Sequence, residues 1–189
     1  MLLRHRARTI EPRPAEQRPG FEHLEDDWIT MLRWLHANRV EYVLVGPVAD
    51  AIRGNVEAKG PVAIVPAPYG RNFERLSRAL WSAHARLRVE GTAAPPGQET
   101  LPVKLSAEKL GGGERWTLRC GAYDLDIEGR PAGAPSYQEL LYEAVMFDPA
   151  PDAAVEVASP EDLEHYAYVR RTGVSPEIRI TRNAQVESG

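Results

Sequence analysis

The fold class is decided by two apolar runs, Glu41-Tyr-Val-Leu-Val-Gly46 and Pro61-Val-Ala-Ile-Val-Pro66. Both runs are short, rich in β-branched residues and bounded by Gly or Pro, which is the pattern of a buried strand. Between them, residues 48–53 have the length of a short helical turn that ends at Gly54. The sequence therefore predicts two strands joined through a short helix.

Apolar residues at helical spacing predict further helices around these strands. A first helix follows the acidic run 25–27, which suits a helix N-terminus, and another starts at about Arg71. Ser136 and Glu139 form a capping-box pattern, and the Ser-Pro pair at 159–160 opens a last helix. The capping-box helix is expected to carry Leu140, Leu141, Val145 and Phe147.

A β-hairpin is predicted within residues 116–127. Apolar and polar residues alternate in 116–120 and again in 123–127, and Gly121 marks the turn between them. Residues 154–158 predict one more strand. Together these elements indicate an α/β (α+β) fold with a small mixed β-sheet of about five strands flanked by helices.

The composition is that of one ordinary globular domain. The 189 residues include 23 Lys and Arg, 27 Asp and Glu, 43% hydrophobic residues and one cysteine. No apolar run approaches the ~18 residues of a membrane span, and the first residues lack the apolar stretch of a signal peptide. Since one cysteine forms no internal disulfide, we expect a cytoplasmic protein that does not contact a membrane.

Residues 1–24 predict an arginine- and proline-rich tail that is disordered when alone, because it contains little to bury. Residues 1–20 carry five Arg and two Glu, whereas the rest of the chain carries 18 basic and 25 acidic residues. An acidic body argues against a broad nucleic-acid face on the folded part. We expect this tail, a domain at 25–172 and a C-terminal tail at 173–189. The first tail either solubilises the protein or docks RNA or an acidic partner through Arg4, Arg6, Arg8, Arg13 and Arg18.

The strongest chemical pattern is a row of carboxylates in the second hairpin strand. Asp124, Asp126 and Glu128 recur with the two-residue period of a strand, so their side chains share one face. Carboxylate oxygens suit Mg²⁺, which keeps water and substrate phosphates in its remaining positions. A solvated acidic strand face gives the same pattern, so both interpretations stay open.

Other catalytic schemes find little support in the sequence. The five histidines are scattered without metal-ligand spacing, and no Gly-x-Ser-x-Gly elbow occurs. The glycines at 111–113 lack the Lys and the Ser or Thr of a phosphate-binding P-loop. Cys120 falls on the apolar side of its strand, where a thiol packs rather than reacts.

The order of these elements resembles that of the minimal nucleotidyltransferases of the polymerase-β-like superfamily, above all the AbiEii-like and toxin–antitoxin members. The similarity begins at residues 41–54 and 61–66 and continues through 121–127 and 157–163. It implies a nucleotidyltransferase-like fold. It also implies that a glycine and a second Gly or Ser after the first strand contact nucleotide phosphates. An Asp-x-Asp pair and a later carboxylate would then bind two metals.

The catalytic part of that pattern is broken in this chain. Gly46 matches the first glycine, but Pro47 follows it and has no N–H to offer a phosphate. At the positions of the Asp pair stand Pro61 and Ala63. The later carboxylate persists, matched by Asp124 with Asp126 as its near neighbour. We therefore expect no cofactor, and Mg²⁺ only if the chain is active.

The favoured hypothesis is a pseudoenzyme: a catalytically degenerate nucleotidyltransferase-fold protein that acts as a protein-binding or nucleotide-binding regulatory or accessory subunit. The alternative is an active metal-dependent nucleotidyltransferase that uses Asp124 and Asp126. It would move a nucleoside monophosphate from NTP to a hydroxyl of a protein, an RNA or a small molecule. Asp50 and Glu57 are candidates to join Asp124 in an unusual metal site. A third hypothesis is an RNA-binding accessory factor that acts through the tail alone.

Overall fold

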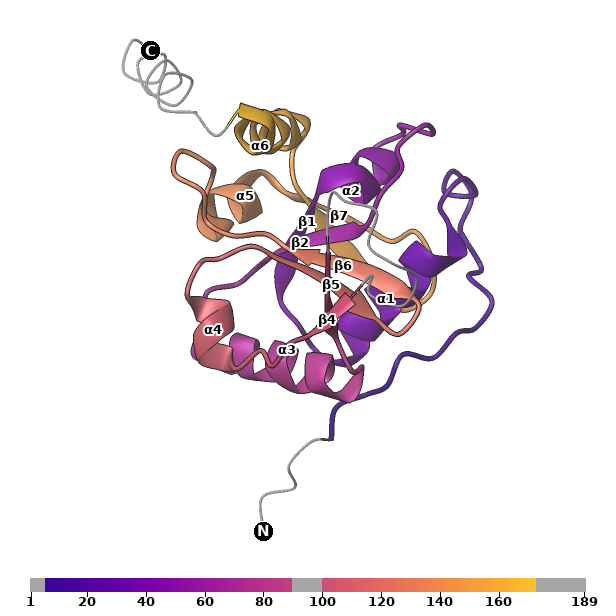
Figure 1. Cartoon of the computed structure of the whole chain (residues 1–189). Coiled ribbons are helices and arrows are strands. Elements are labelled where there is room, and N and C mark those ends of the chain that lie inside the picture. The colour runs from indigo at the N-terminus through magenta and orange to yellow at the C-terminus, as the bar shows by residue number, and fades with distance from the viewer. Residues whose placement is uncertain (1–5, 90–99, 173–189) are drawn as a thin grey trace.

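The computed structural model describes residues 6–89 and 100–172, so Arg4 and the C-terminal tail lie outside it. Helices and strands alternate along the described chain (Figure 1). The helices are α1 (Asp26–Ala37), α2 (Gly46–Ile52), α3 (Gly70–Ser82), α4 (Ala107–Gly111), α5 (Tyr137–Glu143) and α6 (Pro160–Thr172). The strands are β1 (Tyr42–Val45), β2 (Val62–Pro66), β3 (Arg86–Arg88), β4 (Thr100–Pro102), β5 (Trp116–Cys120), β6 (Tyr123–Ile127), β7 (Val145–Phe147) and β8 (Val155–Val157).

These strands form one mixed sheet in the order β4-β3-β5-β6-β2-β1-β8-β7. β1 and β2 are antiparallel, and β2 lies parallel to β6, with Ala63 beside Asp126. β5 and β6 form the predicted hairpin, in which Arg119 lies opposite Asp124 and Thr117 lies opposite Asp126. The sheet therefore brings the two N-terminal strands next to the carboxylate row.

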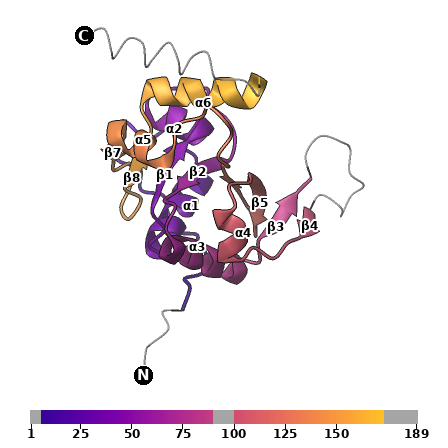
Figure 2. The ribbon, with the colours of Figure 1, turned by 90° about the vertical axis from the view of Figure 1, so that its left-hand side faces the viewer.

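Helices lie on both sides of the central sheet. Figures 1 and 2 show α1 and α3 on one side and α2, α5 and α6 on the other. Leu125 and Ile127 of β6 are buried in the apolar core together with Ile29 and Leu32 of α1. Figure 2 also shows β3 and β4 extending away from the rest of the sheet. In the described part of the chain, no helix combines the length and the apolar character needed to cross a bilayer.

The mixed α+β architecture is confirmed, but the sheet has eight strands where about five were expected. β3, β4 and β7 have three residues each, too few for a periodic signal. The capping box of Ser136 and Glu139 is confirmed. Its helix ends at Glu143, however, and Val145 and Phe147 belong to β7. There they pair with β8, as suits a β-branched and an aromatic residue.

Residues 6–24 lie against the body of the protein, which corrects the expected disorder. Arg33 of α1 is only 7% exposed. Its guanidinium donates hydrogen bonds to the carbonyl oxygens of Pro14 (2.8 Å) and Ala15 (2.6 Å). It donates a third to Pro151 O at 2.9 Å. Composition does not reveal this docking, because the segment is held largely through backbone carbonyls, which every residue has.

The arginines of this segment have separate surroundings. Arg13 pairs with Asp152 at 2.7 Å, and Arg18 pairs with Asp148 at 3.2 Å. These two therefore contact the body of the protein itself. Arg6 and Arg8 are exposed and line a groove that is described below.

We predict that Arg33→Met releases the N-terminal segment. Three carbonyl groups would lose a charged donor, so the free energy of unfolding should fall by about 2–3 kcal/mol in urea denaturation. A glutamate-specific protease should also cleave after Glu16, next to the docked Ala15, faster than in the wild type. Arg71→Met, at an exposed position of α3, is the control and should change stability by less than about 0.5 kcal/mol. Equal cleavage of Arg33→Met and the control would contradict the docking.

Candidate functional site

A row of alternating arginine and carboxylate side chains crosses the face of the sheet on which α6 lies. We call this row the ladder. Its carboxylates come from β6 and the residue after it, at every second position. Its arginines come from β3, from β5 and the residue before it, and from α6. In order, the members are Arg119, Asp124, Arg88, Asp126, Arg115, Glu128 and Arg170.

Each of the first two carboxylates is bound by two guanidinium groups. Oδ1 of Asp124 lies 2.9 Å from Nε of Arg119, and its Oδ2 lies 3.2 Å from an Nη atom of Arg88. Oδ1 of Asp126 accepts from the other Nη atom of Arg88. Oδ2 of Asp126 accepts from an Nη atom of Arg115 at 3.0 Å. Arg88 thus bridges two aspartates, and both oxygens of Asp126 are occupied.

Glu128 continues the ladder to the C-terminal helix. Its Oε2 lies 3.4 Å from Nε of Arg115, and its Oε1 lies 3.3 Å from an Nη atom of Arg170 in α6. Asp126 and Glu128 are 1% and 5% exposed. Burial raises the pKa of the Glu128 carboxyl above its ordinary value, while the nearby charges of Arg170 and Arg115 act in the opposite direction. Such buried acids need cationic partners to stay charged.

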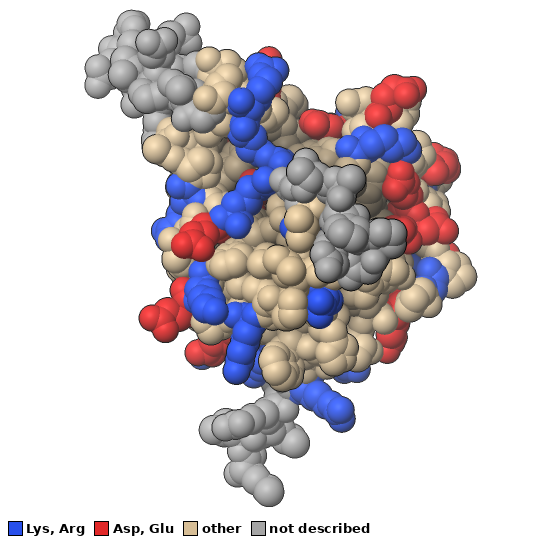
Figure 3. Space-filling model, in the orientation of Figure 1, with Lys and Arg blue, Asp and Glu red and all other residues tan. Residues whose placement is uncertain are grey.

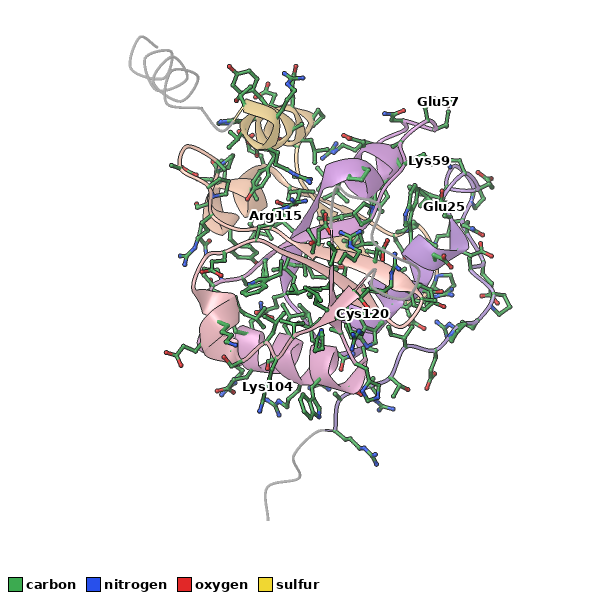
Figure 4. All side chains as sticks on the ribbon, viewed as in Figure 1. Glu25, Glu57, Lys59, Lys104, Arg115 and Cys120 are labelled. Atoms are coloured by element: carbon green, nitrogen blue, oxygen red, sulfur yellow. The ribbon has the colours of Figure 1, made fainter. Side chains whose placement is uncertain are left out.

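The ladder has an arginine at each end. Four arginines alternate with three carboxylates along it. The side chains at the two ends, Arg119 and Arg170, are each 36% exposed. Figure 3 shows Lys and Arg side chains running from the region of α6 toward the centre of this face, and Figure 4 places Arg115 between α6 and the sheet.

The glycine after β1 contacts β2, the strand next to the carboxylate strand β6. A Cβ on Gly46 would be 3.0 Å from the Cβ of Ala63, which is the register neighbour of Asp126. Gly46 also has a φ of +72°, a conformation that side chains disfavour. The sequence comparison matched Asp124 to the later carboxylate of the family, with Asp126 as its neighbour. In the structure, the strand register places Asp126 next to Ala63. Gly46, Ala63 and Asp126 therefore form one local cluster.

Pro47 fills the space beside this cluster. A Cβ on Gly60 would lie 2.6 Å from Cγ of Pro47, so the proline ring packs directly on the backbone of Gly60. Pro47 stands in the first turn of α2 and has no N–H. The position that the resemblance assigns to phosphate binding is thus an apolar ring in contact with a neighbouring loop.

The residues around Asp126 fit a metal ion poorly. Both of its oxygens already contact arginines, and Ala63 beside it has no ligand atom. Burial raises the pKa of the Asp50 carboxyl in α2, and Figure 4 shows Glu57 at the rim of the molecule, away from Arg115. The described ranges hold no group of three or more His, Cys, Asp or Glu placed to bind a metal. A cation would have to displace a guanidinium group.

Cys120 is buried at the end of β5, as its place on the apolar side predicted. Burial raises the pKa of its thiol to about 12. The thiol therefore stays protonated at neutral pH, which does not suit a nucleophile.

The arginines of the ladder are the functional residues that sequence reasoning missed. Arg119 had a signal: a two-residue hairpin turn at Gly121 puts it directly opposite Asp124. Arg88 had none, because it comes from a segment far from the hairpin in sequence. Arg170 was a candidate only as an unaligned substitute for the C-terminal Lys of the family that the chain resembles, and its approach to Glu128 depends on the tertiary fold.

No protein-family model matches the chain, and no curated protein matches it. The site is therefore defined by its own geometry. It belongs to an α+β protein whose central carboxylates are neutralised by arginines contributed by the same chain.

We predict that Asp126→Asn destabilises the protein by about 3 kcal/mol or more in urea denaturation, because it leaves Arg88 and Arg115 without their shared buried anion. Asp148→Asn is the matched control. It breaks an exposed ion pair with Arg18 and should cost less than about 1 kcal/mol. If the three carboxylates instead repelled one another around a cation site, Asp126→Asn would leave stability unchanged or raise it.

Proposed function

We propose that the chain is a non-catalytic protein with a nucleotidyltransferase-like fold, and that it acts as a regulatory or accessory subunit by binding a partner protein. One observation carries the proposal: both oxygens of Asp126, the carboxylate nearest to Gly46 and Ala63, are bound by Arg88 and Arg115. In metal-dependent nucleotidyl transfer, such oxygens hold the cation that stabilises charge on the phosphates. Here guanidinium groups neutralise the carboxylate.

Nucleotide binding without turnover has weaker support than protein binding. The Pro47 ring packs on Gly60, and the two cavities described below are lined by neither Gly46 nor Asp126. A nucleotide would also need a donor for its phosphates where Pro47 has none. Arg119 and Arg170, at the ends of the ladder, are partly exposed. Two partly exposed guanidinium groups are a smaller feature than the pocket that a nucleotide needs.

The edge of the sheet at β7 supports a protein partner. β7 is the last strand of the sheet, and Figure 2 shows it at the border of the molecule. Val145 and Met146 are 48% and 56% exposed, and Tyr142 just before them is 90% exposed. An apolar edge strand is a template for an added strand. We therefore assign the partner as a protein that pairs an extended segment with β7.

The first test is for nucleotidyl transfer. Incubation with each radiolabelled NTP and Mg²⁺ or Mn²⁺ should give no labelled product on the protein itself, on total RNA or on proteins of a cell lysate. Isothermal titration should show no metal-dependent binding of NTP. The active alternative predicts labelling that requires metal and is lost in Asp126→Asn, and that result would overturn the proposal.

The second test is for the partner. Met146→Lys places a charge on the edge strand, which opposes strand addition, whereas Val56→Lys places the same charge on an exposed apolar position elsewhere. Affinity purification with the wild type and with Val56→Lys should recover the same partner protein. With Met146→Lys, the recovered amount of that protein should be at least tenfold lower. If all three forms retain the same proteins equally, β7 does not bind the partner.

A further inference from the structure

A groove runs along α3, on a part of the molecule that the proposed function does not use. One hollow of about 1220 Å³ lies between residues 6–9, the second half of α3 and residues 102–106. A second, of about 760 Å³, lies between residues 6–11, residues 37–39 and the first part of α3. Both are lined by Arg6 and Arg78, so the two hollows are adjacent. We call them together the α3 groove.

The α3 groove gathers basic residues of a chain whose body is acidic. Eight cationic side chains line it, against two acidic ones, Glu11 and Glu74. The cations are Arg6, Arg8, Arg39, Arg71, Arg75, Arg78, Arg86 and Lys104. Figure 3 shows several Lys and Arg side chains at the lower part of the molecule, where Figure 1 places α3. The net charge of the chain did not indicate this basic face, because net charge averages over the whole surface.

The spacing of these arginines follows the helix. Arg71, Arg75 and Arg78 stand four and three residues apart in α3, so they lie on one side of it. Arg78 also lies 3.9 Å from the carboxylate of Glu74, one turn earlier in the helix. Arg71 and Arg78 are seven residues apart, which is about 10 Å along the helix at 1.5 Å per residue. The groove therefore presents an extended line of positive charge.

An aromatic side chain lies at one end of this line. Trp81 is 70% exposed, and the ammonium of Lys104 lies 5.8 Å from its ring centroid. Figure 4 places Lys104 beside α3. A large exposed indole flanked by cations suits a base, whose flat face stacks on the ring while the neighbouring phosphates meet the charges.

We propose that the α3 groove binds single-stranded nucleic acid, with the backbone along Arg71, Arg75 and Arg78 and a base on Trp81. A duplex keeps its base faces inside and cannot use Trp81. An acidic peptide would complement the charge but not the exposed indole. The binding site lies outside the ladder and β7, so it is a separate property from the proposed function.

The proposal is tested by fluorescence anisotropy with labelled U12 and dT12, a 12-base-pair duplex and inorganic polyphosphate, at 50 and 200 mM salt. The wild type should bind at least one single strand more tightly than the duplex, and a preference between U12 and dT12 identifies RNA or DNA. Arg71→Gln/Arg75→Gln/Arg78→Gln should weaken this binding by about tenfold or more. It should also reduce the slope of log affinity against log salt by about 2, at ~0.7 per lost phosphate contact.

Trp81→Ala should weaken single-strand binding by about five- to a hundredfold without changing the salt slope, because stacking is not ionic. Tyr142→Ala, at another exposed aromatic residue, and Lys59→Gln/Arg130→Gln/Arg171→Gln, with the same loss of charge elsewhere, are the matched controls. Circular dichroism checks that every variant is folded before its binding is compared. The proposal fails if no single strand binds at 50 mM salt, or if the duplex binds as tightly. It also fails if Trp81→Ala leaves U12 and dT12 binding unchanged, as for a polyphosphate site, or if the control variants lose as much affinity.

Discussion

The buried carboxylate of Asp126, held between Arg88 and Arg115, is the interaction on which the centre of this sheet depends. An ionised carboxylate at 1% exposure is costly unless its charge is matched. That requirement fixes β3, the segment before β5 and strand β6 relative to one another. It also distinguishes this site from a cation site, because the positive charge comes from side chains of the same chain instead of from an ion.

Much of the fold was predictable from local patterns. The two apolar runs at 42–45 and 62–66, the 116–127 hairpin and the capped helix at Ser136 are found where periodicity and turn residues predicted them. The strands that were missed are three residues long and are stabilised by their neighbours rather than by their own pattern. Val145 shows the limit clearly, since its spacing from Leu141 continues the apolar face of the helix although a β-branched residue favours a strand.

The sequence predicted the carboxylates of the candidate site but not the arginines that bind them. The two-residue period correctly put Asp124, Asp126 and Glu128 on one face, but it carried no information about what that face would meet. Their partners arrive from β3 and α6, which are distant in sequence. The N-terminal segment shows the same limit, because Arg33 binds backbone carbonyls that no composition distinguishes.

The ladder also bears on how the protein unfolds. It connects a short strand that extends from the body, the central hairpin and the last helix of the described chain through a single series of shared charges. Detaching any one of these elements removes a partner from a buried or half-buried charge, so partial opening carries an electrostatic cost. Segments that are distant in sequence are thereby coupled in unfolding.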